Sequence, residues 1–144
     1  MGGKIHRVLE NDLSFLLHTD SHTGSVQDLS FSPKRSDQFV SIDGNGTFKV
    51  WDLSEYKAVF SANSGKLSQG SSCSIALDDE SLITGWRDGF VRCYERGVGQ
   101  PIWEIANAHR GAVTAVYVDG NYILTGGEDG AVRVWARINR KLLI

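Results

Sequence analysis

The chain has 144 residues, of which 41% are hydrophobic and 22% are charged, and its formal net charge is −2. This composition is ordinary for a globular protein, and it lacks the basic excess expected of a protein that binds nucleic acid through a charged face. No apolar run approaches the roughly 20 residues that span a bilayer, and residues 1–6 contain no apolar signal core. We therefore expect a cytoplasmic protein without a membrane or nucleic-acid partner.

Short alternating segments separated by glycine-rich turns run along the whole chain. Sixteen glycines and only two prolines suit many tight turns, and a period of two in hydrophobicity indicates strands. We therefore expect an all-β, antiparallel fold with no helix longer than about two turns. In chain order, the expected strands cover residues 4–9, 14–18, 25–31, 38–42, 47–52, 57–62, 71–77, 81–85, 90–95, 102–106, 113–118, 122–126, 131–136 and 141–144.

Three of these segments repeat the same turn and the same closing aromatic residue. Residues 41–51, 84–94 and 125–135 align without gaps and end in Trp51, Tyr94 and Trp135, so the period is 43 and then 41 residues. Asp-Gly or Asn-Gly between alternating runs indicates a hairpin, because such turns need a positive φ. A second repeat, His-x-Gly-x-Val, begins at His22 and again at His109. A period of about 40–45 residues with these features is typical of propeller blades.

The Asp-Gly turn, the period and the closing Trp resemble the WD40 family, in which each repeat forms one four-stranded blade of a β-propeller. The expected strands then make about three and a half antiparallel blades: a half blade at 4–18 and full blades at 22–62, 71–106 and 109–144. Because propellers of this kind close with about seven blades, we expect residues 1–144 to be part of a longer protein. The open ends should pair with the remainder of its own propeller or self-associate.

The resemblance also implies a buried network of His, Ser or Thr, Asp and Trp in each blade, which stabilises only when its members are satisfied. The last blade has a complete set, the first has Asn in place of Asp, and the middle one lacks His and has Tyr in place of Trp. By position these residues are His109, Thr125, Asp129 and Trp135; His22, Ser41, Asn45 and Trp51; and Thr84, Asp88 and Tyr94. The last blade should therefore be the most sharply defined.

Four segments resemble a narrower group, the two-propeller WD-repeat proteins of axonemal doublet microtubules, and in particular their second propeller. They are Lys4–Leu9, Leu16–Thr19, Gly85–Arg92 and Asn107–Ala115. This resemblance implies a non-catalytic protein–protein interaction scaffold in the cytoskeleton of a cilium or flagellum axoneme, with tubulin or axonemal lattice proteins as partners. The alternative is a general WD40 adaptor that displays a peptide-binding face in a cytoplasmic signalling or degradation complex.

We expect no catalytic residue, no cofactor and no metal site. His22 and His109 occupy a position that recurs with the repeat, so a structural hydrogen bond explains them better than general acid–base catalysis does. The acid run at 78–80 is typical of a solvated loop. The two cysteines, Cys73 and Cys93, form no Cys-x-x-Cys pair and therefore indicate no metal or redox motif.

Turn positions supply the candidate interface residues. A large aromatic residue beside an arginine has the composition of an interface anchor, so Trp86 and Arg87 form the leading pair. Asp43 and Glu128 occupy the matching positions of the other two turns. The alternative for Trp86 is that it packs against a neighbouring blade.

The end of the chain is its most basic part, and no acid follows Asp129. The basic residues there are Arg133, Arg137, Arg140 and Lys141. Because alternate residues of a strand share a face, Arg133 and Arg137 are expected on one side. They form either a solvated outer strand or a contact with an acidic partner such as tubulin.

Overall fold

The structure is a computed structural model that describes residues 6–8, 15–17, 21–64, 72–77, 81–96 and 98–144. Within these residues every regular element is a strand and every pairing is antiparallel, which confirms the predicted all-β fold. None of these residues belongs to a helix that would be able to cross a membrane. Several expected strand residues (4–5, 9, 14, 18 and 71) and the acid run at 78–80 lie outside the described ranges.

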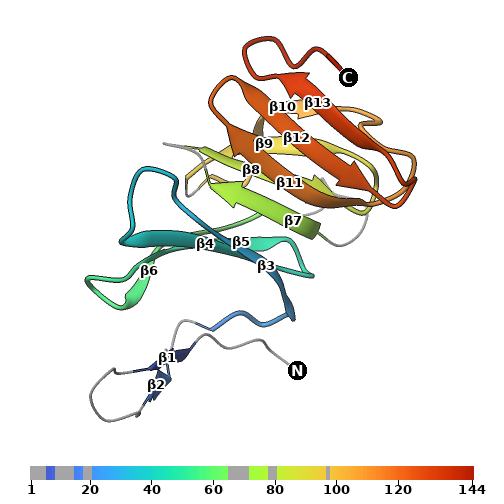
Figure 1. The fold of residues 1–144 in the computed structure, drawn as a ribbon. Helices are drawn as coiled ribbons and strands as arrows, with labels where there is room; N and C mark the ends of the chain where they lie inside the picture. Colours follow the sequence, from blue (N-terminus) through green and yellow to red (C-terminus); the bar gives the residue numbers. More distant parts are fainter. Residues whose placement is uncertain (1–5, 9–14, 18–20, 65–71, 78–80, 97) are drawn as a thin grey trace.

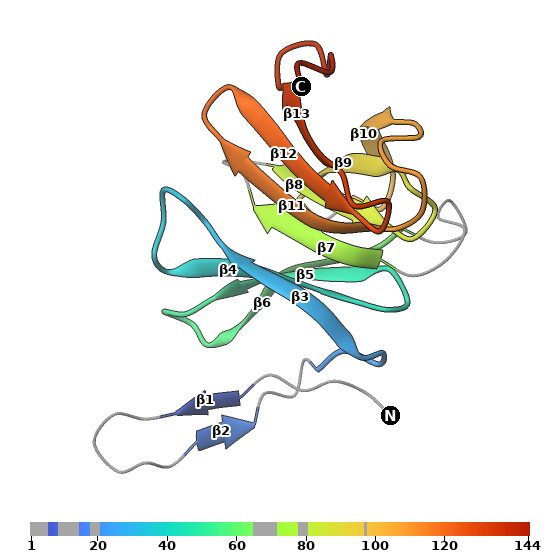
Figure 2. The ribbon, with the colours of Figure 1, turned by 45° about the vertical axis from the view of Figure 1, so that its right-hand side comes forward.

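The strands form one hairpin and three larger sheets, in which strands adjacent in sequence are adjacent in space (Figures 1 and 2). The hairpin pairs β1 (His6–Val8) with β2 (Phe15–Leu17). The first sheet contains β3 (Val26–Phe31), β4 (Gln38–Asp43), β5 (Thr47–Asp52) and β6 (Lys57–Asn63). The middle sheet contains β7 (Ser72–Leu77), β8 (Ser81–Trp86), β9 (Val91–Glu95) and β10 (Pro101–Ile105). The last sheet contains β11 (Val113–Asp119), β12 (Tyr122–Gly127) and β13 (Val132–Ala136).

The expected strand at 141–144 is replaced by an irregular segment beside β13. Leu142 forms an isolated bridge to Trp135, and the Leu143 amide donates to the Val134 carbonyl at 2.8 Å. A tight turn precedes it, in which the Arg140 amide donates to the Ala136 carbonyl at 2.7 Å and Arg140 takes a positive φ of 57°. This turn brings the end of the chain back to β13 without a regular ladder.

The repeated turns have the same backbone geometry in all three sheets. In each, the amide of the closing glycine donates to the carbonyl three residues earlier: Gly46 to Asp43, Gly89 to Trp86 and Gly130 to Gly127. Those three glycines have φ of 81°, 86° and 78°, a region that side chains with a Cβ rarely adopt. The positive φ that the turn requires therefore explains why the repeated motif ends in glycine.

Two apolar clusters join the three sheets face to face. The first packs residues of β4 and β5, such as Ile42 and Phe48, against Leu82 and Tyr94 of the middle sheet. The second lies between the middle and last sheets and consists of Ile83, Val91, Cys93, Ile105, Ala108, Val113, Ile123 and Trp135. The middle sheet is covered on both faces, and β8 is almost wholly buried for that reason.

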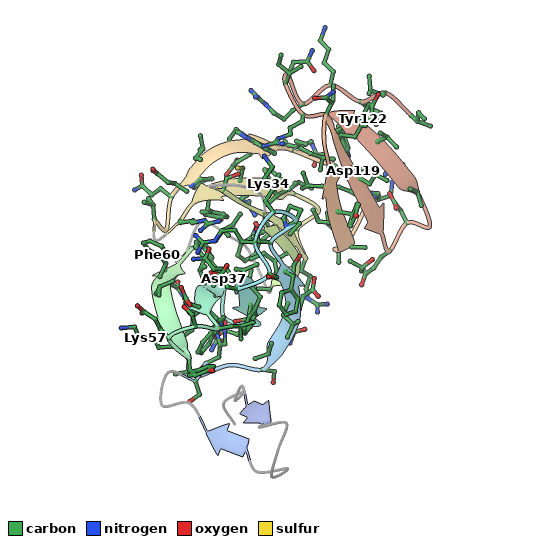
Figure 3. The ribbon with its side chains drawn as sticks, turned by 60° about the vertical axis from the view of Figure 1, so that its left-hand side comes forward. Lys34, Asp37, Lys57, Phe60, Asp119 and Tyr122 are labelled. Carbon is green, nitrogen blue, oxygen red and sulfur yellow. The ribbon has the colours of Figure 1, made fainter. Side chains whose placement is uncertain are left out.

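The outer surfaces remain accessible where no further sheet covers them. On the last sheet, 64% of Tyr117 and 72% of Val132 are exposed. On the first sheet, Figure 3 shows Lys57 and Phe60 along β6, whose side chains are exposed. The middle sheet therefore differs from its two neighbours in how completely it is enclosed.

Candidate functional site

The last sheet brings together the four residues that the repeat assigns to it. The His109 Nε2 atom lies 2.7 Å from Thr125 Oγ1, and His109 Nδ1 lies 2.9 Å from Asp129 Oδ1. Trp135 Nε1 donates to the same Thr125 hydroxyl at 3.0 Å. Because both ring nitrogens of His109 are engaged and the side chain is buried, this histidine holds the turn to the strands.

The carboxylate of this cluster, that of Asp129, is strongly stabilised in its charged form. The backbone N–H of Arg110, then the guanidinium of Arg133 and the ring of His109, hold the pKa of the Asp129 carboxyl well below its usual range. Its Oδ1 atom also accepts a hydrogen bond from the Ala131 amide at 3.1 Å. Asp129 therefore remains a carboxylate and ties the turn after β12 to the loop before β11.

The first sheet has the same arrangement, but its acid is Asp43 and not a residue at position 45. His22 Nδ1 lies 3.0 Å from Asp43 Oδ2, His22 Nε2 lies 2.6 Å from Ser41 Oγ, and Trp51 Nε1 donates to Ser41 Oγ at 2.8 Å. Burial lowers the pKa of His22 below its usual value of 6.5.

The prediction that Asn45 joins this network is wrong. The other carboxylate oxygen of Asp43 accepts the amides of Asn45 and Thr47 at 2.8 and 3.0 Å, so one acid, placed two residues earlier, both caps the turn and binds the histidine. Asn45 is exposed. Asp43 has a fully buried side chain, and its predicted role as an interface residue is therefore also wrong.

The middle sheet replaces the missing indole with Trp86. Trp86 Nε1 donates to Thr84 Oγ1 at 2.7 Å, and the Thr84 hydroxyl donates to the Arg92 carbonyl at 3.0 Å. Tyr94, at the predicted position of the closing aromatic, packs its ring 5.0 Å from that of Phe48 and 6.3 Å from that of Trp86. Burial raises the pKa of Tyr94 to about 12.

Trp86 is fully buried, so the prediction that it anchors an external interface is wrong and packing against a neighbouring sheet is its role. A Cβ on Gly46, in the turn of the first sheet, would lie 3.4 Å from the Trp86 ring. The indole therefore lies between the turns of the first and middle sheets.

In the middle sheet, where no histidine contacts the turn acid among the described residues, Arg92 binds it. Its Nη2 atom donates to Asp88 Oδ2 at 2.8 Å and its Nε atom donates to Glu104 Oε1 at 3.1 Å. The guanidinium also lies 4.6 Å from the centre of the Phe90 ring. Only 4% of the side chain is exposed, so Arg92 is a buried cation held by two carboxylates.

The space around Gly127 shows how closely His109 approaches this point of the repeat in the last sheet. Trp86 occupies the position that Gly127 holds in the last sheet. A Cβ on Gly127 would lie 2.5 Å from Cγ and Nδ1 of His109, a distance that side-chain atoms do not tolerate. In the last sheet a side chain at this position would therefore displace His109, whereas Asp43 holds the same position in the first sheet and bonds the ring of His22.

Two of the predicted interface residues do reach the surface. Arg87 and Glu128 are exposed and belong to the turn rim, which we define as residues 43–46, 86–89 and 127–130. Glu128 Oε2 accepts the Ala112 amide at 3.2 Å. Gly89 lies close to the His109 carbonyl, because a Cβ there would be 2.5 Å away from it, so the turn of the middle sheet contacts the loop before β11.

Sequence reasoning missed Asp43, Trp86 and Arg92 as parts of the polar clusters. A usable signal was present for Arg92, because an arginine follows the turn acid by four residues both at Asp88 and at Asp129. No set of three His, Cys, Asp or Glu side chains within the described part of the chain is placed to hold a metal ion.

Comparison with known proteins agrees with this geometry. The family model described as "WD domain, G-beta repeat" matches residues 14–52 and 99–136. The chain belongs to the WD40 family. With its antiparallel sheets of three and four strands, it is a segment of a WD40 β-propeller, as predicted.

The relatives are named for cilia and for WD repeats. Cilia- and flagella-associated protein 52 of Sus scrofa is 29% identical over 133 residues, which cover 91% of this chain and 21% of that protein. WD repeat-containing protein 70 of Xenopus tropicalis is 26% identical over 131 residues, or 83% of this chain and 21% of that protein. The chain thus spans about a fifth of the length of these relatives, and the sequence similarity to cilia- and flagella-associated protein 52 and to WD repeat-containing protein 70 extends over most of the chain.

Among solved structures, the computationally designed Ika4 protein superposes with a TM-score of 0.75 at 25% identity, covering 93% of this chain and 79% of that one. The designed Ika8 protein gives a TM-score of 0.74, also at 25% identity, and covers 94% of this chain and 41% of that one. Both similarities extend over nearly the whole chain.

Proposed function

We propose that this chain is a non-catalytic protein–protein interaction scaffold of the cilium or flagellum axoneme, with tubulin or axonemal lattice proteins as its partners. The observation that carries the proposal is the similarity to cilia- and flagella-associated protein 52, which extends over 91% of the chain. The WD40 repeats support the scaffold role, because rigid propeller blades present extended binding surfaces.

The geometry of the polar clusters supports a non-catalytic role. Both ring nitrogens of His22 and of His109 lie within hydrogen-bond distance of side chains in the fold. A general acid or base needs a nitrogen directed at a reacting group, and these rings offer none. The clusters hold the turn rim in place, and Arg87 and Glu128 are left on its surface for contact with a partner.

Co-sedimentation with stabilised microtubules tests the proposal. The chain should pellet with microtubules, and the double variant Arg87→Glu, Glu128→Lys should pellet less while its circular dichroism spectrum stays unchanged. Arg35→Glu is the matched control, because Arg35 is exposed on the β3–β4 loop and pairs there with Asp37. A chain that stays in the supernatant but captures peptides from an array would contradict the axonemal role and favour the adaptor.

A further inference from the structure

A polar cavity of about 350 Å³ opens beside the His109 cluster of the last sheet. It is lined by Asn107, His109, Arg110 and Arg133. Asn107 and Arg110 come from the loop between β10 and β11, and Arg133 comes from β13. Two guanidinium groups thus line one cavity, and no acid is among its lining residues.

In the middle sheet, the arginine that corresponds to Arg133 is bound by two carboxylates. Arg92 and Arg133 have the same position in the repeat, four residues after the turn acid. Arg92 binds that acid, Asp88, and through its Nε atom it also binds Glu104, which is its cross-strand partner on β10. A guanidinium at this position therefore accommodates two carboxylates.

Arg133 has only the first of these two carboxylates. Its Nη1 atom donates to Asp129 Oδ2 at 2.9 Å and to the Ala108 carbonyl at 3.1 Å. Within the described ranges, its Nε and Nη2 atoms have no hydrogen-bond partner, and 31% of the side chain is exposed. Residues 141–144 lie beside β13 but carry no acid that would serve as the counterpart of Glu104.

Arg110 adds a second cation to the cavity. Its backbone amide donates to Asp129 Oδ2 at 3.0 Å, which fixes the loop, while its guanidinium forms no hydrogen bond with any described residue and is exposed. Arginine presents several donors in a planar fork that matches a carboxylate.

We propose that this cavity binds the side-chain carboxylate of an aspartate or glutamate in an acidic segment of a partner protein. Arg133 donates from Nε as Arg92 does to Glu104, and Arg110 closes over the same carboxylate from the loop. The inference rests on the scaffold function proposed above and names the chemistry of its partner.

Fluorescence anisotropy with a labelled peptide of six glutamates tests the proposal on the whole chain, with a peptide of six glutamines as the matched probe. The glutamate peptide should bind and the glutamine peptide should not. R110Q and R133Q should each weaken binding about tenfold, as expected for loss of a hydrogen bond between charged groups. R110Q is the decisive variant, because only the backbone of Arg110 contributes to the fold.

Two controls separate a built site from general charge attraction. R35Q removes the same charge at a distant exposed position and should change the affinity less than twofold. R133K keeps the charge but lacks the planar fork, and should weaken binding nearly as much as R133Q. Equal losses in R35Q and R110Q, full binding by R133K, or no binding of the glutamate peptide would each overturn the proposal. Failure to pellet with microtubules while the glutamate peptide still binds would instead contradict only the axonemal role.

Discussion

The middle and last sheets secure the same turn with different side chains. In the last sheet, His109 connects Thr125 to Asp129 and Trp135 completes the cluster. In the middle sheet, Trp86 takes over the hydrogen bond to the threonine, and Arg92 binds the acid as Arg133 does in the last sheet. The repeat thus determines the backbone and the turn, and both sheets keep the arginine that binds the acid, while the residue that bonds the threonine differs.

Removal of Trp86 should have the largest effect on stability. The side chain is fully buried and joins the first and middle sheets, so Trp86→Ala should lower the free energy of unfolding by about 3–5 kcal/mol. Urea denaturation followed by circular dichroism measures this loss. Trp103→Ala, at a half-buried position of β10, should cost less; an equal or larger loss there would show that Trp86 does not anchor the middle sheet.

Removal of Arg92 should cost more stability than removal of Arg133, because Arg92 is the more deeply buried of the two. Arg92→Met leaves Asp88 without its buried partner and Glu104 without its cross-strand partner, and should cost about 3–5 kcal/mol, the usual result of breaking a buried ion pair. Arg133→Met should cost clearly less, because the Arg133 side chain is 31% exposed. Thermal unfolding of both variants under the same conditions makes the comparison, and similar losses would contradict the proposed difference between the surroundings of the two arginines.

Acid should weaken the first sheet through His22. Burial lowers the pKa of His22 in the folded chain below 6.5, so the unfolded chain binds the proton first as the pH falls. The neutral His22 ring contributes fully to the free energy of unfolding above pH 6.5. This contribution is lost as the pH falls from 6.5 toward the pKa of the folded chain, with a slope of at most about 1.4 kcal/mol per pH unit. The urea midpoints of the wild type and of His22→Gln should converge as the pH falls from 7.5 to 5.5. If the two midpoints instead change in parallel with pH, His22 is not the source of the acid sensitivity.

The fold was predictable from sequence because its signals are local. The Asp-Gly turns, the closing aromatic residues and the alternation between them indicate strands and hairpins without knowledge of distant contacts. The strand expected at 141–144 failed because alternation does not reveal the positive φ of Arg140, which turns the chain sharply before it.

The polar clusters were only partly predictable, because their membership depends on which side chain fills a space between sheets. Alignment placed Asn45 opposite Asp129, but a carboxylate reaches the same histidine and the same turn amides from position 43. Alignment likewise treated Trp86 as a rim residue, although it points into the space that a histidine occupies in the last sheet. Such substitutions are visible only when the distances between turns are known.

A double-mutant cycle on Gly127 and His109 tests most directly whether a side chain at position 127 and His109 compete for one space in the last sheet. Gly127→Ala in the wild-type chain should be destabilising, because its Cβ would lie 2.5 Å from the His109 ring. In a His109→Gly background the same change should be neutral or stabilising, which gives a coupling of about 1 kcal/mol or more in urea denaturation. The same cost of Gly127→Ala in both backgrounds would contradict the account.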